Sequence, residues 1–185
     1  MKNFTYVDNS NVYLEGCRMS AVRKAFPGAK TIIDAMNNRV LDVAWQIDYG
    51  RLHEFACGDP TTIGGAKLWG SPPPGDSFWA MVERLGFKVT KYERNFANKE
   101  KKVDVAIAHQ MTKDAYSGVV RRGLDEITLV AGDSDYVPVV NDLVSGGFIV
   151  HVVFWGHAAK ELRETATRFV SLDDHFDFLS RVVKA

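Results

Sequence analysis

The sequence contains few cysteines, no long apolar run and no excess of charge of either sign. Its 185 residues include two cysteines, Cys17 and Cys57, which form no C-x-x-C pair and no Cys/His cluster at zinc spacing. These absences argue against a structural zinc and a disulfide framework, and they favour a reducing cytoplasm. The longest apolar run, 148–155, is interrupted by His151 and is too short to span a bilayer, so no membrane partner is expected.

Positive and negative side chains balance, with 23 Lys and Arg against 23 Asp and Glu. A protein that binds nucleic acid through its overall charge should be basic, so any such partner needs a local basic patch. The chain does not open with a basic start and a long apolar segment, so we expect no signal peptide. A hydrophobic content of 46% with 25% charged residues is typical of a folded protein, and this length suits a single domain over 1–185.

Strand-like and helix-like segments alternate along the chain. The predicted strands are mostly continuous apolar runs, as parallel strands covered on both faces are. The clearest helix is 103–116, whose apolar residues repeat at helical spacing along one face. The sequence therefore predicts an α/β fold with a central, mainly parallel sheet. Strands are predicted at 4–7, 65–69, 87–92, 126–131, 148–155 and 169–171, and further helices up to about residue 24 and at 49–56, 77–85, 136–144, 158–167 and 173–183.

Four aspartates are predicted to meet at one edge of this sheet. Two follow the ends of predicted strands, a third is expected at the N-cap of the next helix, and a fourth at the start of the 103–116 helix. Ligands of open parallel sheets bind beyond the carboxyl ends of the strands, where these positions converge. In this order the residues are Asp8, Asp133, Asp135 and Asp104, accompanied by Asn11 and Ser134.

Clustered carboxylates repel one another unless a cation neutralises them, and hard oxygen ligands select Mg²⁺ or Mn²⁺. Two such ions, about 3.5–4 Å apart, can activate a water molecule and stabilise the leaving oxygen of a phosphodiester. Taken singly, each aspartate also has a structural interpretation as a helix cap, a partner of a helix dipole or part of a turn. Taken together they predict a metal site, because burying like charges without a cation costs stability.

The four aspartates lie in three motifs, YVDNSN at 6–11, KVDVA at 102–106 and VAGDSDYVP at 130–138. Together and in this order, the motifs resemble the signature blocks of NYN domains, which belong to the PIN-like nucleases, and most closely the bacterial LabA-type branch. The resemblance implies a three-layer α/β/α PIN-like (Rossmannoid) fold and divalent-metal-dependent cleavage of RNA. It also implies that 28–48 is a family-variable insertion. By position, the implied catalytic and metal-binding residues are Asp8, Asp104, Asp133 and Asp135.

The chain departs from the family pattern at four positions. Asn9 replaces a usual Gly, and Asn is the next most tolerant residue for a left-handed turn. Gln110 replaces a frequent Asp, but six residues of helix advance it about 9 Å from Asp104, so the two cannot share an ion. Ala159 and Thr167 stand where Ser and Asp are usual, so a ligand expected there is missing. The changes at Gln110, Ala159 and Thr167 support the alternative that the chain is a non-catalytic RNA-binding or protein-interaction module, and a homodimer is a further hypothesis.

A basic strip precedes Asp104. Residues 84–102 contain seven Lys and Arg and two Glu, a local charge of seven minus two, or +5. Such a strip could steer phosphates, and its aromatic residues could stack unpaired bases, which predicts single-stranded RNA as the partner; a solvated loop is the alternative. His157, after another strand, could contact phosphate or donate a proton. The candidate substrate-binding residues are Lys91, Tyr92, Arg94, Phe96, Lys101, Lys102 and His157.

Overall fold

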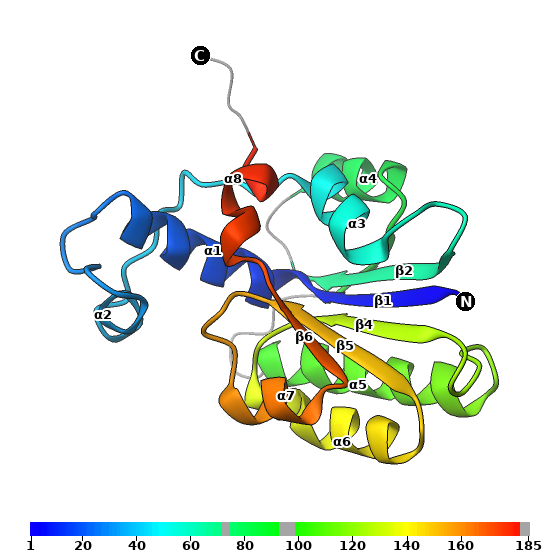
Figure 1. The fold of residues 1–185 in the computed structure, drawn as a ribbon. Helices are drawn as coiled ribbons and strands as arrows, with labels where there is room; N and C mark the ends of the chain where they lie inside the picture. Colours follow the sequence, from blue (N-terminus) through cyan, green and yellow to red (C-terminus); the bar gives the residue numbers. More distant parts are fainter. Residues whose placement is uncertain (72–74, 93–98, 182–185) are drawn as a thin grey trace.

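The computed structural model of the protein describes residues 1–71, 75–92 and 99–181, the side chains of 99–102 excepted. Within these residues a parallel sheet forms the centre of the molecule (Figure 1). Its strands are β1 (Asn3–Asp8), β2 (Ile63–Gly70), β3 (Lys88–Lys91), β4 (Glu126–Val130), β5 (Ile149–Phe154) and β6 (Arg168–Ser171). They are ordered β3-β2-β1-β4-β5-β6, and every neighbouring pair is parallel. The predicted α/β class with a parallel sheet is confirmed.

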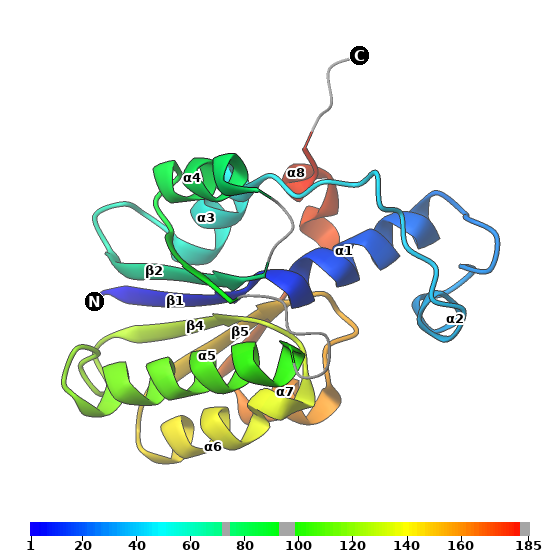
Figure 2. The same ribbon diagram turned by 180° about the vertical axis from the view of Figure 1, so that it is seen from behind.

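Helices cover both faces of the sheet, which gives three layers (Figures 1 and 2). The helices are α1 (Asn9–Arg23), α2 (Ile32–Asn37), α3 (Tyr49–Cys57), α4 (Asp76–Arg84), α5 (Lys99–Tyr116), α6 (Val137–Ser145), α7 (Lys160–Thr165) and α8 (Phe176–Leu179), with short 3₁₀ turns η1 (Ser134–Tyr136) and η2 (Asp173–His175). Helices α1, α3, α4 and α8 pack on one face, and α5, α6 and α7 on the other. Helix α2 packs beside α1, away from the sheet.

Successive strand residues enter two different cores. In β4, Ile127 and Leu129 pack beneath α5 and α6, whereas Val130 joins the core on the α1 face. Side chains alternate across a strand, so a strand buried on both faces has to be apolar throughout. This explains why the strands read as continuous apolar runs. The predicted apolar face of α5 is buried, with Val103, Ile107, Met111 and Ala115 all in the core.

Several predicted helix bounds are wrong. Helix α5 begins at Lys99 rather than at residue 103, because its lysine-rich first turn has no apolar periodicity that could reveal it. Within the closing helix predicted at 173–183, the structure has η2 and a short α8 that ends at Leu179, and residues 182 and 183 lie outside the described residues. Beyond it, Ser180 forms an antiparallel bridge with Ile47, which ends the helical path. Helix α7 is shorter than predicted at both ends.

Residues 28–48 are fastened to α1. The buried carboxylate of Asp42 accepts a hydrogen bond at 2.6 Å from Nζ of Lys24, the C-cap residue of α1. Trp45 enters the main core, where Gly16 of α1 provides the space, since a Cβ at Gly16 would collide with the indole ring. The segment is therefore part of the packed structure, and its status as a family-variable insertion stays a prediction.

Asp125 ties together the amino ends of β1 and β4. Its carboxylate is buried and accepts hydrogen bonds from the backbone N–H of Lys2 at 2.8 Å and from Nε and Nη2 of Arg121 at 2.8 and 2.7 Å. The Arg121 guanidinium holds the pKa of Asp125 well below its usual value, although burial acts in the opposite direction.

Replacing Asp125 by asparagine should lower the free energy of unfolding by about 2 kcal/mol at neutral pH, because hydrogen bonds to charged groups contribute about that much. The pKa of Asp125 is lower in the folded than in the unfolded state. Its stabilising contribution is therefore complete above the ordinary Asp pKa of about 3.9 and is lost as the pH falls below that value. Urea unfolding should show that the difference in free energy of unfolding between the wild type and the variant becomes smaller below about pH 4. A difference independent of pH would contradict the ion pair.

Candidate functional site

The carboxyl ends of β1 and β4 lie side by side, because the two strands pair in parallel with Val7 opposite Val130. Asp8 is the last residue of β1 and the N-cap of α1, where its Oδ1 accepts a hydrogen bond from the Asn11 backbone N–H at 3.1 Å. Asp133 follows the end of β4. Strand pairing thus brings two aspartates from distant parts of the sequence to one edge of the sheet.

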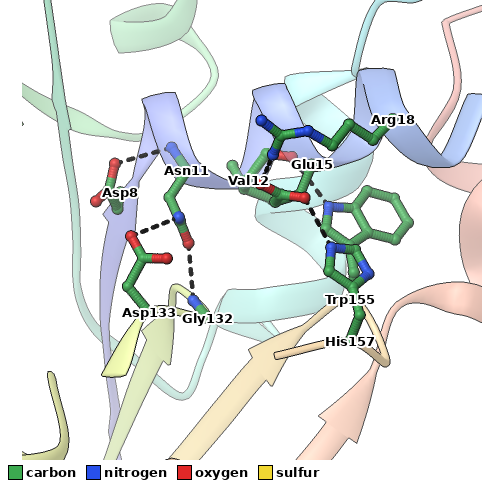
Figure 3. Close-up of polar contacts among 9 residues, drawn as sticks. All are labelled: Asp8, Asn11, Val12, Glu15, Arg18, Gly132, Asp133, Trp155 and His157. Carbon is green, nitrogen blue, oxygen red and sulfur yellow. Dashed lines mark hydrogen bonds and ion pairs between the residues drawn. The ribbon is translucent and has the colours of Figure 1, made fainter. Parts of the chain in front are cut away.

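Asn11 joins the two strand ends (Figure 3). Its side-chain Nδ2 donates to Oδ2 of Asp133 at 2.7 Å, and its Oδ1 accepts from the backbone N–H of Gly132 at 2.8 Å. A Cβ at Gly132 would collide with the ring of Phe154, so only glycine lets the backbone approach this closely. The first turn of α1 is therefore bonded to the loop that carries Asp133.

Tyr136 brings in a carboxylate from α5. This fully buried residue of η1 places its hydroxyl oxygen 3.0 Å from Oδ2 of Asp8 and 3.2 Å from Oδ1 of Asp104. A hydroxyl has one proton, so it can donate to only one of the two carboxyl groups at a time. Tyr136 was not among the predicted site residues, because an aromatic residue at the start of a helix has the same local pattern as an ordinary core residue.

The surroundings of Asp8 disfavour its charge. Burial raises the pKa of Asp8 to about 7, and the nearby Asp104 carboxyl adds to the rise, while hydrogen bonds from the Asn11 N–H and the Tyr136 hydroxyl oppose it. Its protonated form is therefore favoured to a much higher pH than that of an ordinary aspartate. Such a group gains from a neighbouring cation, which favours the ionised form.

Asp133 is exposed, unlike the buried Asp8, yet its charge is also disfavoured. Partial desolvation of its carboxyl group raises its pKa, the amide of Asn11 lowers it, and repulsion by Asp104, Glu15 and Asp135 raises it further. The repulsion shows that these acidic groups lie near enough to act on one another. The edge of the sheet is consequently a place of concentrated negative charge.

Two of the predicted site residues occupy unexpected positions in their elements. Asp104 lies in the second turn of α5 rather than at the helix start, because α5 begins five residues earlier, at Lys99. Asp135 is exposed inside η1 rather than an N-cap, since a 3₁₀ turn precedes α6. Ser134, also exposed, is the first residue of η1.

Three of the departures from the family pattern have partners in the structure. Asn9 is the first residue of α1, so the expected left-handed turn is wrong; its Oδ1 accepts from the Tyr49 hydroxyl at 2.5 Å. Gln110 donates to Oδ1 of Asp114 at 2.9 Å, one turn further along α5. The side chain of Thr167 accepts a backbone N–H of β5 at 3.1 Å.

A second polar group lies further along α1 (Figure 3). Nε2 of His157 lies 2.8 Å from Oε2 of Glu15, which also pairs with Arg18. The sequence interpretation included His157 but missed Glu15. The available signal was spacing: Glu15 stands four residues after Asn11 and so shares its helix face.

The basic strip is only partly described. Lys91 ends β3 at the same edge of the sheet and forms an exposed ion pair with Asp76 at 2.8 Å. Tyr92 is half-buried against the core beneath α5. Arg94 and Phe96 lie outside the described residues, and Lys101 and Lys102 belong to α5 with side chains outside them.

Within the part of the chain that the structure describes, no group of three or more His, Cys, Asp or Glu side chains is arranged to hold a metal ion. The donor chemistry itself fits a hard divalent cation. The site offers carboxylate oxygens, and burial and mutual repulsion raise the pKa of Asp8 and Asp133. Burial and mutual repulsion both destabilise the ionised carboxylates, and a bound cation would neutralise their charge.

Comparison with known proteins places the chain in a family. The NYN domain profile matches residues 5–173, so the protein belongs to the NYN domain family, within the PIN-like nuclease superfamily. This confirms the resemblance seen in the three motifs, although the match does not assign a branch of the family.

The fold also occurs in a solved structure. The crystal structure of a protein of unknown function from Vibrio parahaemolyticus has a TM-score of 0.64 to this chain, with 19% identity over 94% of each chain. At this identity the likeness shows the fold alone. No curated protein matches the chain. None of the helices in the described ranges is both long and apolar enough to cross a membrane.

Proposed function

We propose that the protein is a metal-dependent ribonuclease that hydrolyses phosphodiester bonds within single-stranded RNA. Mg²⁺ or Mn²⁺ would be held by Asp8, Asp104, Asp133 and Asp135. The observation that carries the proposal is the Tyr136 hydroxyl, which lies within hydrogen-bond reach of both Asp8 and Asp104 in a chain of the NYN family. Assignment to the LabA-type branch and to the cytoplasm belongs to the same proposal.

Hydrogen bonds within the protein orient the proposed ligands before a metal ion binds. Asn11 orients the Asp133 carboxylate and is itself held by the Gly132 N–H, while Tyr136 orients Asp8 from the opposite side. When bound, the divalent ion supplies a Lewis acid for the phosphodiester and a source of hydroxide at neutral pH. The task of the protein is to present ionised carboxylates at fixed positions.

The same edge of the sheet also carries groups suited to RNA. Lys91 and Tyr92 at the end of β3 offer a cation for phosphate and a ring for base stacking. His157 is held by Glu15 beside the end of β5 and is a candidate to contact phosphate or donate a proton. Overall neutrality implies that binding to RNA is modest and weakens with salt.

The proposal is tested by incubating the protein with labelled single-stranded RNA in the presence of Mn²⁺, with an EDTA control. Linear and circular RNAs of the same sequence should both be cut, because an endonuclease needs no free end. A matched duplex RNA should be cut more slowly. Cleavage that persists in EDTA, or intact circular RNA beside degraded linear RNA, would contradict metal-dependent endonuclease activity.

One observation favours the alternative, a non-catalytic RNA-binding or protein-interaction module. No group of three metal-ligating side chains is pre-arranged among the residues with described positions. Calorimetric titration with Mn²⁺ separates the two functions. RNA binding without uptake of Mn²⁺ would favour the module, and uptake of Mn²⁺ would favour the nuclease.

A further inference from the structure

Tyr136 is fixed in place by the core of the protein. Its side chain has no exposed surface and belongs to the same apolar cluster as Val103 and Ile107 of α5. Close packing restricts the ring to one orientation, because protein interiors leave few voids into which it could turn. The position of its hydroxyl is therefore set by the fold rather than by solvent.

This hydroxyl connects two carboxyl groups that come from different elements. Asp8 ends β1 and Asp104 lies in α5, and the hydroxyl oxygen is 3.0 Å from the first and 3.2 Å from the second. The other oxygen of Asp8 is held by the Asn11 backbone N–H at 3.1 Å. Tyr136 thus contacts the oxygen of Asp8 that Asn11 does not hold, and the same hydroxyl lies within hydrogen-bond reach of Asp104.

We propose that Tyr136 is a positioning residue that holds Asp8 and Asp104 in the orientation in which they bind Mg²⁺ or Mn²⁺. This role rests on the proposed function. Carboxylates that bind metals are themselves oriented by hydrogen bonds, and loss of such a partner lowers metal affinity about 10–100-fold. Removing the hydroxyl should therefore affect the binding of the ion much more than it affects the fold.

The chain offers a matched control. Tyr6 is also fully buried in the same apolar cluster, and its hydroxyl donates to the buried Asp114 at 2.7 Å. Asp114 lies ten residues along α5 from Asp104, or about 15 Å. Each Tyr→Phe variant removes one buried hydroxyl that bonds to aspartate, but only the aspartates beside Tyr136 are proposed ligands.

The experiment is calorimetric titration of the full chain with Mn²⁺ alone, for the wild type, Tyr136→Phe and Tyr6→Phe. We expect Tyr136→Phe to weaken Mn²⁺ binding about 10–100-fold and Tyr6→Phe to change it less than about twofold. The rise in melting temperature produced by Mn²⁺ provides a second measurement. It should be smaller for Tyr136→Phe than for the other two proteins.

Cleavage of single-stranded RNA should require more Mn²⁺ in Tyr136→Phe than in the wild type or Tyr6→Phe. For Tyr136→Phe, the Mn²⁺ concentration that gives half-maximal rate should rise by the same factor as the dissociation constant, and excess Mn²⁺ should restore the rate. If Tyr136→Phe binds Mn²⁺ as tightly as the wild type, the positioning role is overturned while the metal site stands. If the wild type itself takes up no Mn²⁺, the proposed function fails and the positioning role fails with it.

Discussion

Replacing Asp133 by asparagine is expected to reduce Mn²⁺-dependent cleavage of single-stranded RNA by more than about 100-fold, while thermal unfolding changes little. Losing an outer-shell partner of a metal ligand already costs about 10–100-fold, and Asp133 is proposed to be a ligand itself. The asparagine keeps an oxygen that can accept the hydrogen bond from Asn11. Because burial raises the pKa of Asp133, removing its charge should not weaken the metal-free fold.

Asp59→Asn is the matched control for this variant. Asp59 is an exposed aspartate before β2, at the amino edge of the sheet, and it accepts a hydrogen bond from the Thr61 N–H at 2.8 Å. It carries the same charge as Asp133 but lies on the opposite edge. RNA cleavage should be lost in Asp133→Asn alone. The melting temperatures of the wild type and the two variants should be similar. Full activity in that variant would mean that the site is assigned to the wrong residues.

Asp8→Asn is expected to abolish cleavage and, without metal, to make the protein more stable above pH 7. The pKa of Asp8 is raised to about 7 in the folded protein, from an unfolded value of about 3.9. The folded state therefore binds more protons between these values, and wild-type stability falls as the pH rises through this window. Asparagine has no charge to bury, so the variant should gain roughly 2–4 kcal/mol above pH 7.

Urea unfolding in EDTA, at several pH values from about 4 to 8, measures this gain. The two proteins should be nearly equal at the acidic end and should diverge as the pH rises. Addition of Mn²⁺ should stabilise the wild type only and narrow the difference, since a ligand of the folded state stabilises it. If the variant were less stable than the wild type at pH 8, the charge of Asp8 would not destabilise the folded state.

The approach of two candidate site residues could be predicted from the sequence, because both lie at strand ends. Asp8 and Asp133 each follow an apolar strand, and parallel strands align their carboxyl ends, so their meeting could be predicted from pattern alone. The position of Asp104 in its helix could not, because the first turn of α5 is rich in lysine and has no apolar repeat. The periodicity becomes visible only at Val103.

Contacts between side chains were beyond sequence reasoning. Tyr136 lies beside the predicted aspartates in the sequence, yet its contact with Asp104 depends on how α5 packs against η1. The same limit applies to Asn9, whose partner Tyr49 lies on another helix. Its difference from the family glycine could be noticed in the sequence, but its structural meaning requires the packed fold.

The path of α1 across the ends of β4 and β5 has a consequence for the order in which the chain is made. Asn11 bonds to Gly132, and the backbone carbonyl of Val12 accepts from Nε1 of Trp155 at 3.0 Å. Both partners are synthesised long after β1 and α1, since a ribosome adds about 5–20 residues per second. An unfinished chain therefore holds only the first carboxylates of the site. For the ribonuclease proposed above, the complete set of ligands would therefore be present only after most of the chain has been synthesised.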